Sequence, residues 1–114
     1  MANYFYNEVI MQWGGTEYTV RPTFALCKRV QSKGVNIFAN LKAIQEQEPL
    51  IFDLAIVVSE FLKAAGADVS QDEVLHVALM EDPEAVIGIA GEVFMSMIPQ
   101  KADSAGKPGK KTKK

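Results

Sequence analysis

Cysteine and histidine are scarce in this sequence. Its 114 residues include one cysteine, Cys27, and one histidine, His76, which excludes an internal disulfide and leaves few ligands for a metal site. The chain also lacks an apolar run of about 18 residues, the length that spans a bilayer, and it does not open with a basic flank and an apolar stretch. We therefore expect no membrane span, no secretory signal and a place in the reducing cytoplasm.

Catalytic signatures are missing as well. The sequence contains no glycine-rich phosphate loop, no G-x-S-x-G and no H-E-x-x-H pattern. Its clustered carboxylates, Asp72-Glu73 and Glu81-Asp82-Glu84, fall at the starts of two predicted helices. Negative charge is favourable there because it meets the positive end of the helix dipole, so capping explains these residues without chemistry. We expect no enzymatic activity and no cofactor.

The lone cysteine and histidine are better explained by structure than by chemistry. Cys27 lies three residues after Phe24 and three before Val30, so we predict a small core residue in place of a reactive thiol. His76 lies in the middle of a predicted helix, four residues after Asp72, a spacing that allows the two to pair, and we expect a surface histidine.

Charge is unevenly distributed along the chain. Residues 100–114 hold six of the twelve basic residues and one of the fourteen acidic ones, a formal charge of +5 (6 − 1), whereas residues 1–99 carry −7 (6 − 13). The lysines of residues 100–114 are separated by small and polar residues, a composition that disfavours a packed core. We predict one folded domain over residues 1–99 and a disordered Lys-rich C-terminal tail over residues 100–114.

The N-terminal third predicts a β-hairpin. Residues 7–13 and 16–21 are separated by Gly14 and Gly15, and two glycines between alternating segments favour a two-residue turn. This register gives one mostly apolar and one mostly polar face. The expected pairs are Trp13 with Thr16, Met11 with Tyr18 and Val9 with Val20 on the first face, and Gln12 with Glu17, Ile10 with Thr19 and Glu8 with Arg21 on the second.

Caps and hydrophobic spacing predict five helices after the hairpin. Pro22 cannot continue a central strand, and Thr23 is a suitable N-cap for the first helix. Ser70 and Glu73 form a capping-box pair before the fourth helix. The predicted helices cover residues 24–33, 37–47, 49–65, 71–80 and 83–98. The fold class that follows is mainly α (α+β), an N-terminal β-hairpin packed on a bundle of about five short helices.

The fifth predicted helix is apolar around nearly its whole circumference. Glu92 is the only charge between residues 85 and 98. One interpretation is a central helix that the other four surround. The other is that one side packs inward while another side meets a protein, because a domain of this size has difficulty covering a helix on all sides. The side chains that we predict to bind a partner are Val86, Ile89, Val93, Phe94 and Met97.

The junction between hairpin and first helix resembles a known family. The stretch GTEYTVRPTF, residues 15–24, is similar to the N-terminal signature of the small tail assembly chaperones of long-tailed phages, in particular the group shared with gene transfer agents. In that group a strand runs into G-x-x-Y-x-(L/V)-R-P-T-F and then into a helix. The helical layout is similar over most of residues 5–98. The residues that match the specific part of the motif are Tyr18, Val20, Arg21, Pro22, Thr23 and Phe24.

This resemblance implies a helper protein for the assembly of phage, prophage or gene-transfer-agent particles. Such a chaperone binds the tape-measure protein in the cytoplasm of the bacterial host, keeps it soluble and extended, associates with itself, and is absent from the mature virion. Family members are often made in a second, longer form by a −1 frameshift. One hypothesis is that residues 100–114 lead into an extension that recruits tail-tube protein, and the alternative is a plain lysine tail.

Two other functions remain open. A structural tail component that stays in the virion would share the phage context, although tube proteins are larger and richer in β-sheet. A small nucleic-acid-binding regulator is suggested by the helix–turn–helix-like layout of the third and fourth predicted helices. The fourth helix is acidic at both ends, however, and would repel phosphates. We therefore expect no specific nucleic-acid partner.

Overall fold

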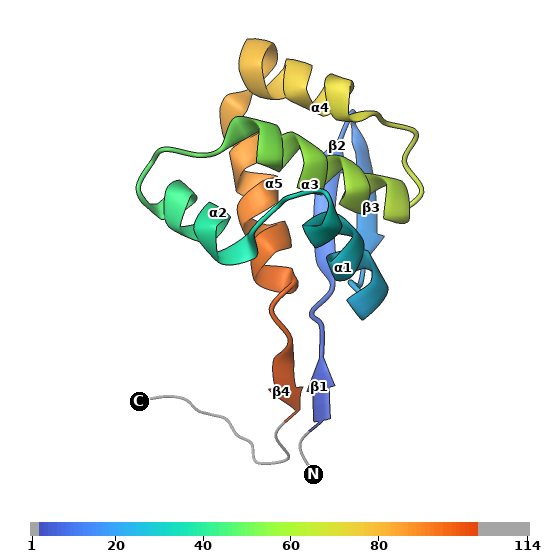
Figure 1. Ribbon diagram of the computed structural model, residues 1–114. Helices are drawn as coiled ribbons and strands as arrows, with labels where there is room; N and C mark the ends of the chain where they lie inside the picture. The colour runs from blue at the N-terminus through green and yellow to red at the C-terminus, as the bar shows by residue number, and fades with distance from the viewer. Residues whose placement is uncertain (1–2, 103–114) are drawn as a thin grey trace, which may run out of the picture.

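The computed structural model describes residues 3–102, which form a hairpin, a helical body and two short terminal strands (Figure 1). The elements are β1 (Asn3–Phe5), β2 (Val9–Trp13), β3 (Thr16–Val20), α1 (Phe24–Ser32), α2 (Ile37–Gln45), α3 (Ile51–Ala64), α4 (Gln71–His76), the π-helix η1 (Val77–Glu81), α5 (Pro83–Ser96) and β4 (Gln100–Ala102). The predicted mainly α (α+β) fold with an N-terminal hairpin is confirmed. Within residues 3–102 no helix is long and apolar enough to cross a membrane.

The hairpin has the predicted register. Trp13 pairs with Thr16 and the ladder ends where Val9 meets Val20. Gly14 and Gly15 have φ angles of 59° and 80°, the left-handed conformation that a tight hairpin turn requires at both positions. The apolar face is buried through Val9 and Met11. On the polar face, Gln12 donates a hydrogen bond of 3.0 Å to Glu17.

The Glu8–Arg21 pair predicted for the polar face does not form. The Arg21 guanidinium donates instead to the backbone carbonyl of Tyr6 at 3.2 Å. The physical reason is that the ladder stops one pair earlier, so the chain before Val9 is free to leave the register. Arg21 thereby ties the segment between β1 and β2 to the end of β3.

The predicted turn from hairpin to helix is present. Pro22 is buried, and the Thr23 hydroxyl accepts a hydrogen bond from the backbone N–H of Leu26 at 3.1 Å. This N-cap fixes the direction in which α1 leaves the hairpin. Tyr18 is half-buried, whereas Phe24 is exposed at the start of α1. Side chains also cap three further helix starts: Asn36 for α2, Ser70 for α4 and Asp82 for α5. The capping box of Ser70 and Glu73 is present as predicted.

The core lies between α3 and α5. Helix α3 crosses the molecule, with α1 and α4 packed against it, while α2 packs on α5 (Figure 1). The hairpin contacts both central helices, β2 against α5 and β3 against α3. The largest buried side chains include one phenylalanine from each central helix, Phe61 and Phe94, and Met11 from the hairpin. The apolar face of the hairpin is therefore covered, as its stability requires.

Two further features differ from prediction. Strand β4 pairs antiparallel with β1, from Phe5–Gln100 to Asn3–Ala102, although residues 100–102 were predicted to belong to the disordered tail. The remaining tail residues, 103–114, lie outside the described part of the chain. The fourth helix does not stay α-helical to Met80 but changes at Val77 into a π-helix.

We expect Phe94→Ala to lower the free energy of unfolding by about 3–5 kcal/mol, because the ring is fully buried and its removal leaves a cavity in the core. Urea denaturation followed by far-UV circular dichroism measures the change. Met95→Ala is the matched control, since its side chain is 55% exposed on the same helix. A loss below about 1 kcal/mol for Phe94→Ala would contradict its place in the core.

Candidate partner-binding groove

The side chains predicted to bind a partner are, with one exception, part of the core. Val86, Val93, Phe94 and Met97 are at most 3% exposed, so this prediction is wrong for them. Ile89 is partly buried and packs against the same core. The physical reason is that α5 is contacted by α2, α3, η1 and β2, which cover these positions.

A different face of α5 is open. Gly88, Gly91, Glu92 and Met95 follow one another at spacings of three, one and three residues and therefore share one side of the helix. This side carries small, charged or flexible residues, whereas the buried side carries valine, alanine and phenylalanine. Small or charged residues recur at helical spacing on one side of α5, and large apolar residues recur on the other. This difference is the sequence signal that could have located the exposed face.

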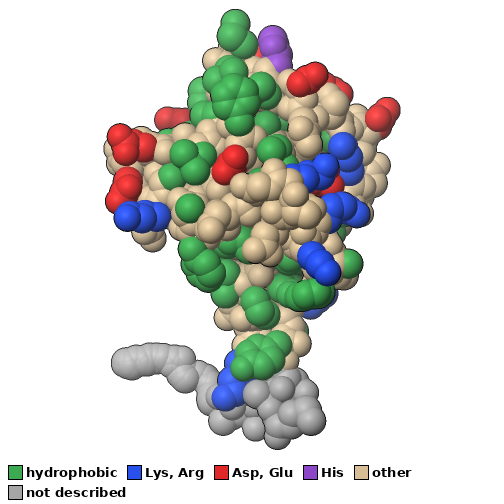
Figure 2. All heavy atoms as spheres, in the orientation of Figure 1, with side chains coloured by type: hydrophobic (Ala, Val, Ile, Leu, Met, Phe, Trp, Pro, Cys, Tyr) green, Lys and Arg blue, Asp and Glu red, His purple; other side chains and the backbone are tan. Residues whose placement is uncertain are grey.

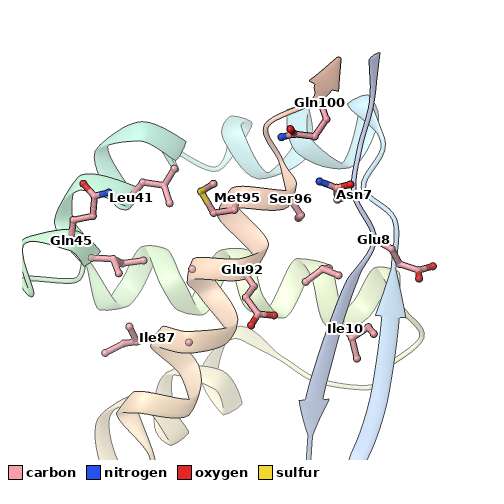
Figure 3. Close-up of a pocket in the computed structure, with 14 residues that line it drawn as sticks. Asn7, Glu8, Ile10, Leu41, Gln45, Ile87, Glu92, Met95, Ser96 and Gln100 are labelled. Atoms are coloured by element: carbon pink, nitrogen blue, oxygen red, sulfur yellow. The ribbon is translucent and has the colours of Figure 1, made fainter. Parts of the chain in front are cut away.

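A groove of about 980 Å³ runs over this face (Figure 3). The exposed side of α5 forms its floor. Leu41, Ile44 and Gln45 of α2 form one wall. The opposite wall comes from the chain that enters β2 and from its first residues, and Figure 3 shows the two walls on either side of α5. The residues of this second wall are Asn7, Glu8, Val9 and Ile10.

The groove continues along the helix. A second hollow of about 380 Å³ shares Ile44, Ile87 and Gly88 with the first and extends to the link between α2 and α3. From Glu84, which lines this second hollow, to Met95 the exposed face of α5 covers roughly 17 Å at about 1.5 Å per residue. The groove is thus about three helical turns long.

Two glycines form the middle of the floor. A Cβ atom added at Gly88 or Gly91 would meet no atom within 4 Å, so packing inside this chain does not require glycine at either position. Both residues nevertheless lie in the interior of α5, where glycine is less favourable than alanine. The helix backbone is therefore open to whatever enters the groove.

The charge of the groove is negative. Glu8 and Glu92 line the main hollow and Glu84 lines the second one. Both sets of lining residues lack Lys, Arg and His. The apolar contribution comes from aliphatic side chains and one methionine, of which Ile10 and Met95 are more than half exposed. A ligand that fits this groove needs an apolar surface and positive charge.

Positive charge gathers on another part of the molecule. The carboxylate of Glu60, only 7% exposed, receives Arg29 at 3.0 Å, Lys33 at 3.8 Å and Lys63 at 3.9 Å. Figure 2 shows Lys and Arg side chains together on one side of the face that it displays. Lys33 and Lys63 also lie at the C-terminal ends of α1 and α3, where positive charge is favourable. This cluster has a structural role because it neutralises a buried carboxylate.

The lone cysteine is half-buried beside Tyr6. Burial raises the pKa of the Cys27 thiol, and the hydrogen bond with the Tyr6 side chain offsets only part of that shift. Burial and the neighbouring Cys27 also raise the pKa of the Tyr6 hydroxyl. A thiol that resists ionisation is a weak nucleophile, which agrees with a structural role for this residue.

The lone histidine lies at the surface, as predicted, and its partner there is Glu81. The His76 Nε2 atom lies 3.1 Å from a carboxylate oxygen of Glu81, because the π-helical turn brings residues five positions apart onto one side. Asp72 lines the same small hollow, but among residues 3–102 it forms no ion pair with His76. The side chains of His76 and Glu81 are both well exposed. Among residues 3–102 no three His, Cys, Asp or Glu side chains converge to hold a metal ion.

We expect Gly88→Ala and Gly91→Ala each to raise the free energy of unfolding by about 0.5–1 kcal/mol, because alanine is the better helix former and the space is open. Urea denaturation measures it. Gly66→Ala is the matched control: its surroundings are equally open, but its φ of +103° strains any residue with a Cβ, so this change should destabilise the chain. Destabilisation by the α5 variants would show that the glycines serve packing.

We also expect Cys27 to react more slowly with iodoacetamide in the folded chain than in urea, measured by mass spectrometry near pH 8. The folded state holds the proton more tightly because the pKa of the thiol is raised. Because the pKa of the thiol is higher in the folded state, its proton contributes to the free energy of unfolding at any pH below the unfolded-state pKa. This contribution is lost as the pH rises through the folded-state pKa. Equal rates in both states would contradict the burial of this side chain.

Comparisons with known proteins give no relative for this chain. No model of a protein family, no curated protein and no solved structure matches it. The shape and charge of the groove and the residues of the hairpin–helix junction are therefore the features that bear on function.

Proposed function

We propose that this protein is a phage tail assembly chaperone, which binds and solubilises the tape-measure protein while the tail is built. The observation that carries the proposal is the open, apolar and acidic groove along α5. The junction through Arg21, Pro22 and Thr23 supports it, because a strand that turns through this motif into a helix is the layout that the family resemblance implies.

The physical demands of that role match a groove of this kind. A long, mostly helical protein that waits for its tube needs its apolar stripes covered by contacts that can later be displaced. A groove about three helical turns long covers only a short segment, so each copy binds weakly and many copies act together. If neighbouring copies of the chaperone also contact each other along the partner, the whole assembly binds more tightly although the affinity of each groove is unchanged.

In this proposal the protein works in the cytoplasm of the bacterial host and leaves before the virion is complete. It acts as a binding module, without catalysis and without a cofactor. A longer, frameshifted form would use residues 100–114 as a linker to an extension that recruits tail-tube protein. A tail component retained in the virion is the alternative that uses the same groove for permanent packing.

The nucleic-acid-binding alternative is less well supported. Three of the six basic residues between positions 1 and 99 surround the carboxylate of Glu60. That carboxylate offsets part of their charge. The groove itself is lined by carboxylates, which repel a phosphate backbone.

We expect this chain to copurify with a long helical protein before assembly and to be missing from finished virions. Quantitative mass spectrometry of soluble complexes and of purified particles measures both. A fixed number of copies in each virion would contradict the chaperone proposal and favour the retained tail component.

In the same cells, the double variant Ile10→Asp with Met95→Asp should lose the long partner while keeping its far-UV circular dichroism, because both side chains are exposed in the groove. Phe38→Asp is the control, since this exposed side chain lies outside the groove lining. Loss of the partner from the control alone would place the binding surface elsewhere.

A further inference from the structure

The chemistry of the groove specifies its occupant more closely. We propose that the groove takes a single amphipathic α-helix of the partner, which lays small residues against Gly88 and Gly91 and carries Lys or Arg on the edge that faces β2. This inference rests on the proposed role of the groove as the partner-binding site. It concerns the shape and charge of the segment that enters.

The first observation is the bare backbone of the floor. Gly88 and Gly91 are three residues apart on the exposed side of α5, and the space in front of both is empty. Since the fold gains nothing from glycine there, the missing side chains matter for something that approaches from outside. Two helices come closest where the facing residues are small, because the distance between their axes is set by the side chains at the contact. The glycines therefore favour a backbone that approaches closely.

The second observation is the shape on either side of the glycines. Ile87 and Met95 stand along α5 at the two ends of the glycine pair, and Leu41 and Ile44 of α2 rise beside it. Side chains of another helix can fill the depression between such ridges. Methionine is flexible enough to adjust to different segments along one partner. The length of about three turns suits one short stretch of helix.

The third observation is the placement of the carboxylates. Glu8 lies on the β2 side of the groove and Glu92 projects from α5, and Figure 3 shows Glu92 between α5 and β2. In the main hollow the α2 wall carries Gln45 but no acidic lining residue. Within this hollow, complementary charge on the partner therefore belongs on the edge of its helix beside β2, and this asymmetry also fixes how the helix is rotated about its axis. Glu84 adds negative charge only where the groove continues toward the link between α2 and α3.

The test uses the full chain and three synthetic peptides of about 20 residues, each with the same stripe of alanine and leucine. The first carries lysine along one edge of the stripe, the second carries glutamate there, and the third is the lysine peptide with a central proline. Fluorescence anisotropy measures the dissociation constants at low and high salt. We expect the lysine peptide to bind at least roughly tenfold more tightly than either other peptide, with an affinity that falls as salt rises.

Two sets of variants connect that preference to the groove. The double variant E8K/E92K should prefer the glutamate peptide, whereas E17K/D68K, with the same change in net charge outside the groove, should keep the preference for lysine. G88A and G91A should each weaken binding of the lysine peptide roughly tenfold although neither destabilises the fold. A role of the glycines in folding alone would leave peptide binding unchanged.

Several results would overturn the inference. If the lysine and glutamate peptides bind with equal affinity, the carboxylates of the groove do not select its occupant. If the proline peptide binds as tightly as the lysine peptide, the occupant is an extended segment, for instance a strand beside β2. No binding of the lysine peptide at about 1 mM removes the helix altogether. Concentration-dependent self-association of the free chain that G91A abolishes would make a second copy the occupant.

Failure of this inference and failure of the chaperone proposal give different results. If the chain remains in virions but the lysine peptide binds as expected, the groove takes a basic helix in a permanent tail component. If the chain copurifies with the long partner before assembly but the peptides show no preference, the chaperone proposal stands and the helix inference falls.

Discussion

The packing of α5 against α3 is the contact on which the rest of this structure depends. Each helix is 14 residues long, and each buries a phenylalanine completely. The hairpin, α1, α2 and α4 are all placed by contacts with one or both of these helices. A two-stranded hairpin and helices of about nine residues or fewer are marginal alone, so their stability comes from this common support.

The same contact decides which side of α5 remains available. Because α3 and β2 take up the large apolar side chains of α5, the helix is anchored by one face and its glycine-bearing face is held rigidly toward solvent. A binding surface on such a helix does not have to be ordered when a partner arrives, which lowers the entropic cost of association. The charged residues follow a similar division: cations collect around Glu60, whereas the described residues that line the groove include carboxylates and no cation.

The parts of the fold that could be predicted from sequence are those governed by local chemistry. The two glycines set the hairpin register, and Thr23 and Ser70 set helix starts, since each acts within a few residues. The parts that could not be predicted depend on contacts between distant segments. Pairing of β1 with β4 joins residues almost a hundred positions apart, and neither three-residue strand has a pattern of its own.

The candidate site shows the same limit. The apolar character of α5 correctly indicated a helix with an inner side, but the choice of its outer side needed the positions of α2, α3 and β2. The prediction selected bulky apolar residues such as Val93 and Phe94. These side chains are buried in the core. Hydrophobicity along a sequence does not separate a side chain that packs inside from one that binds outside. The helical spacing of Gly88, Gly91 and Glu92 carried the better information.

The pairing of β1 with β4 has a mechanical consequence. The two strands are antiparallel, with Asn3 opposite Ala102 at the outer end and Phe5 opposite Gln100 at the inner end, so the chain enters and leaves the described structure at one point (Figure 1). A force that pulls the two ends apart would act first on the outermost pair of this short ladder and break its hydrogen bonds one after another. Only then would the force act on α3 and α5. Gln100 also lines the groove, so the last step of that opening would reach the groove rim while the helical core was still intact.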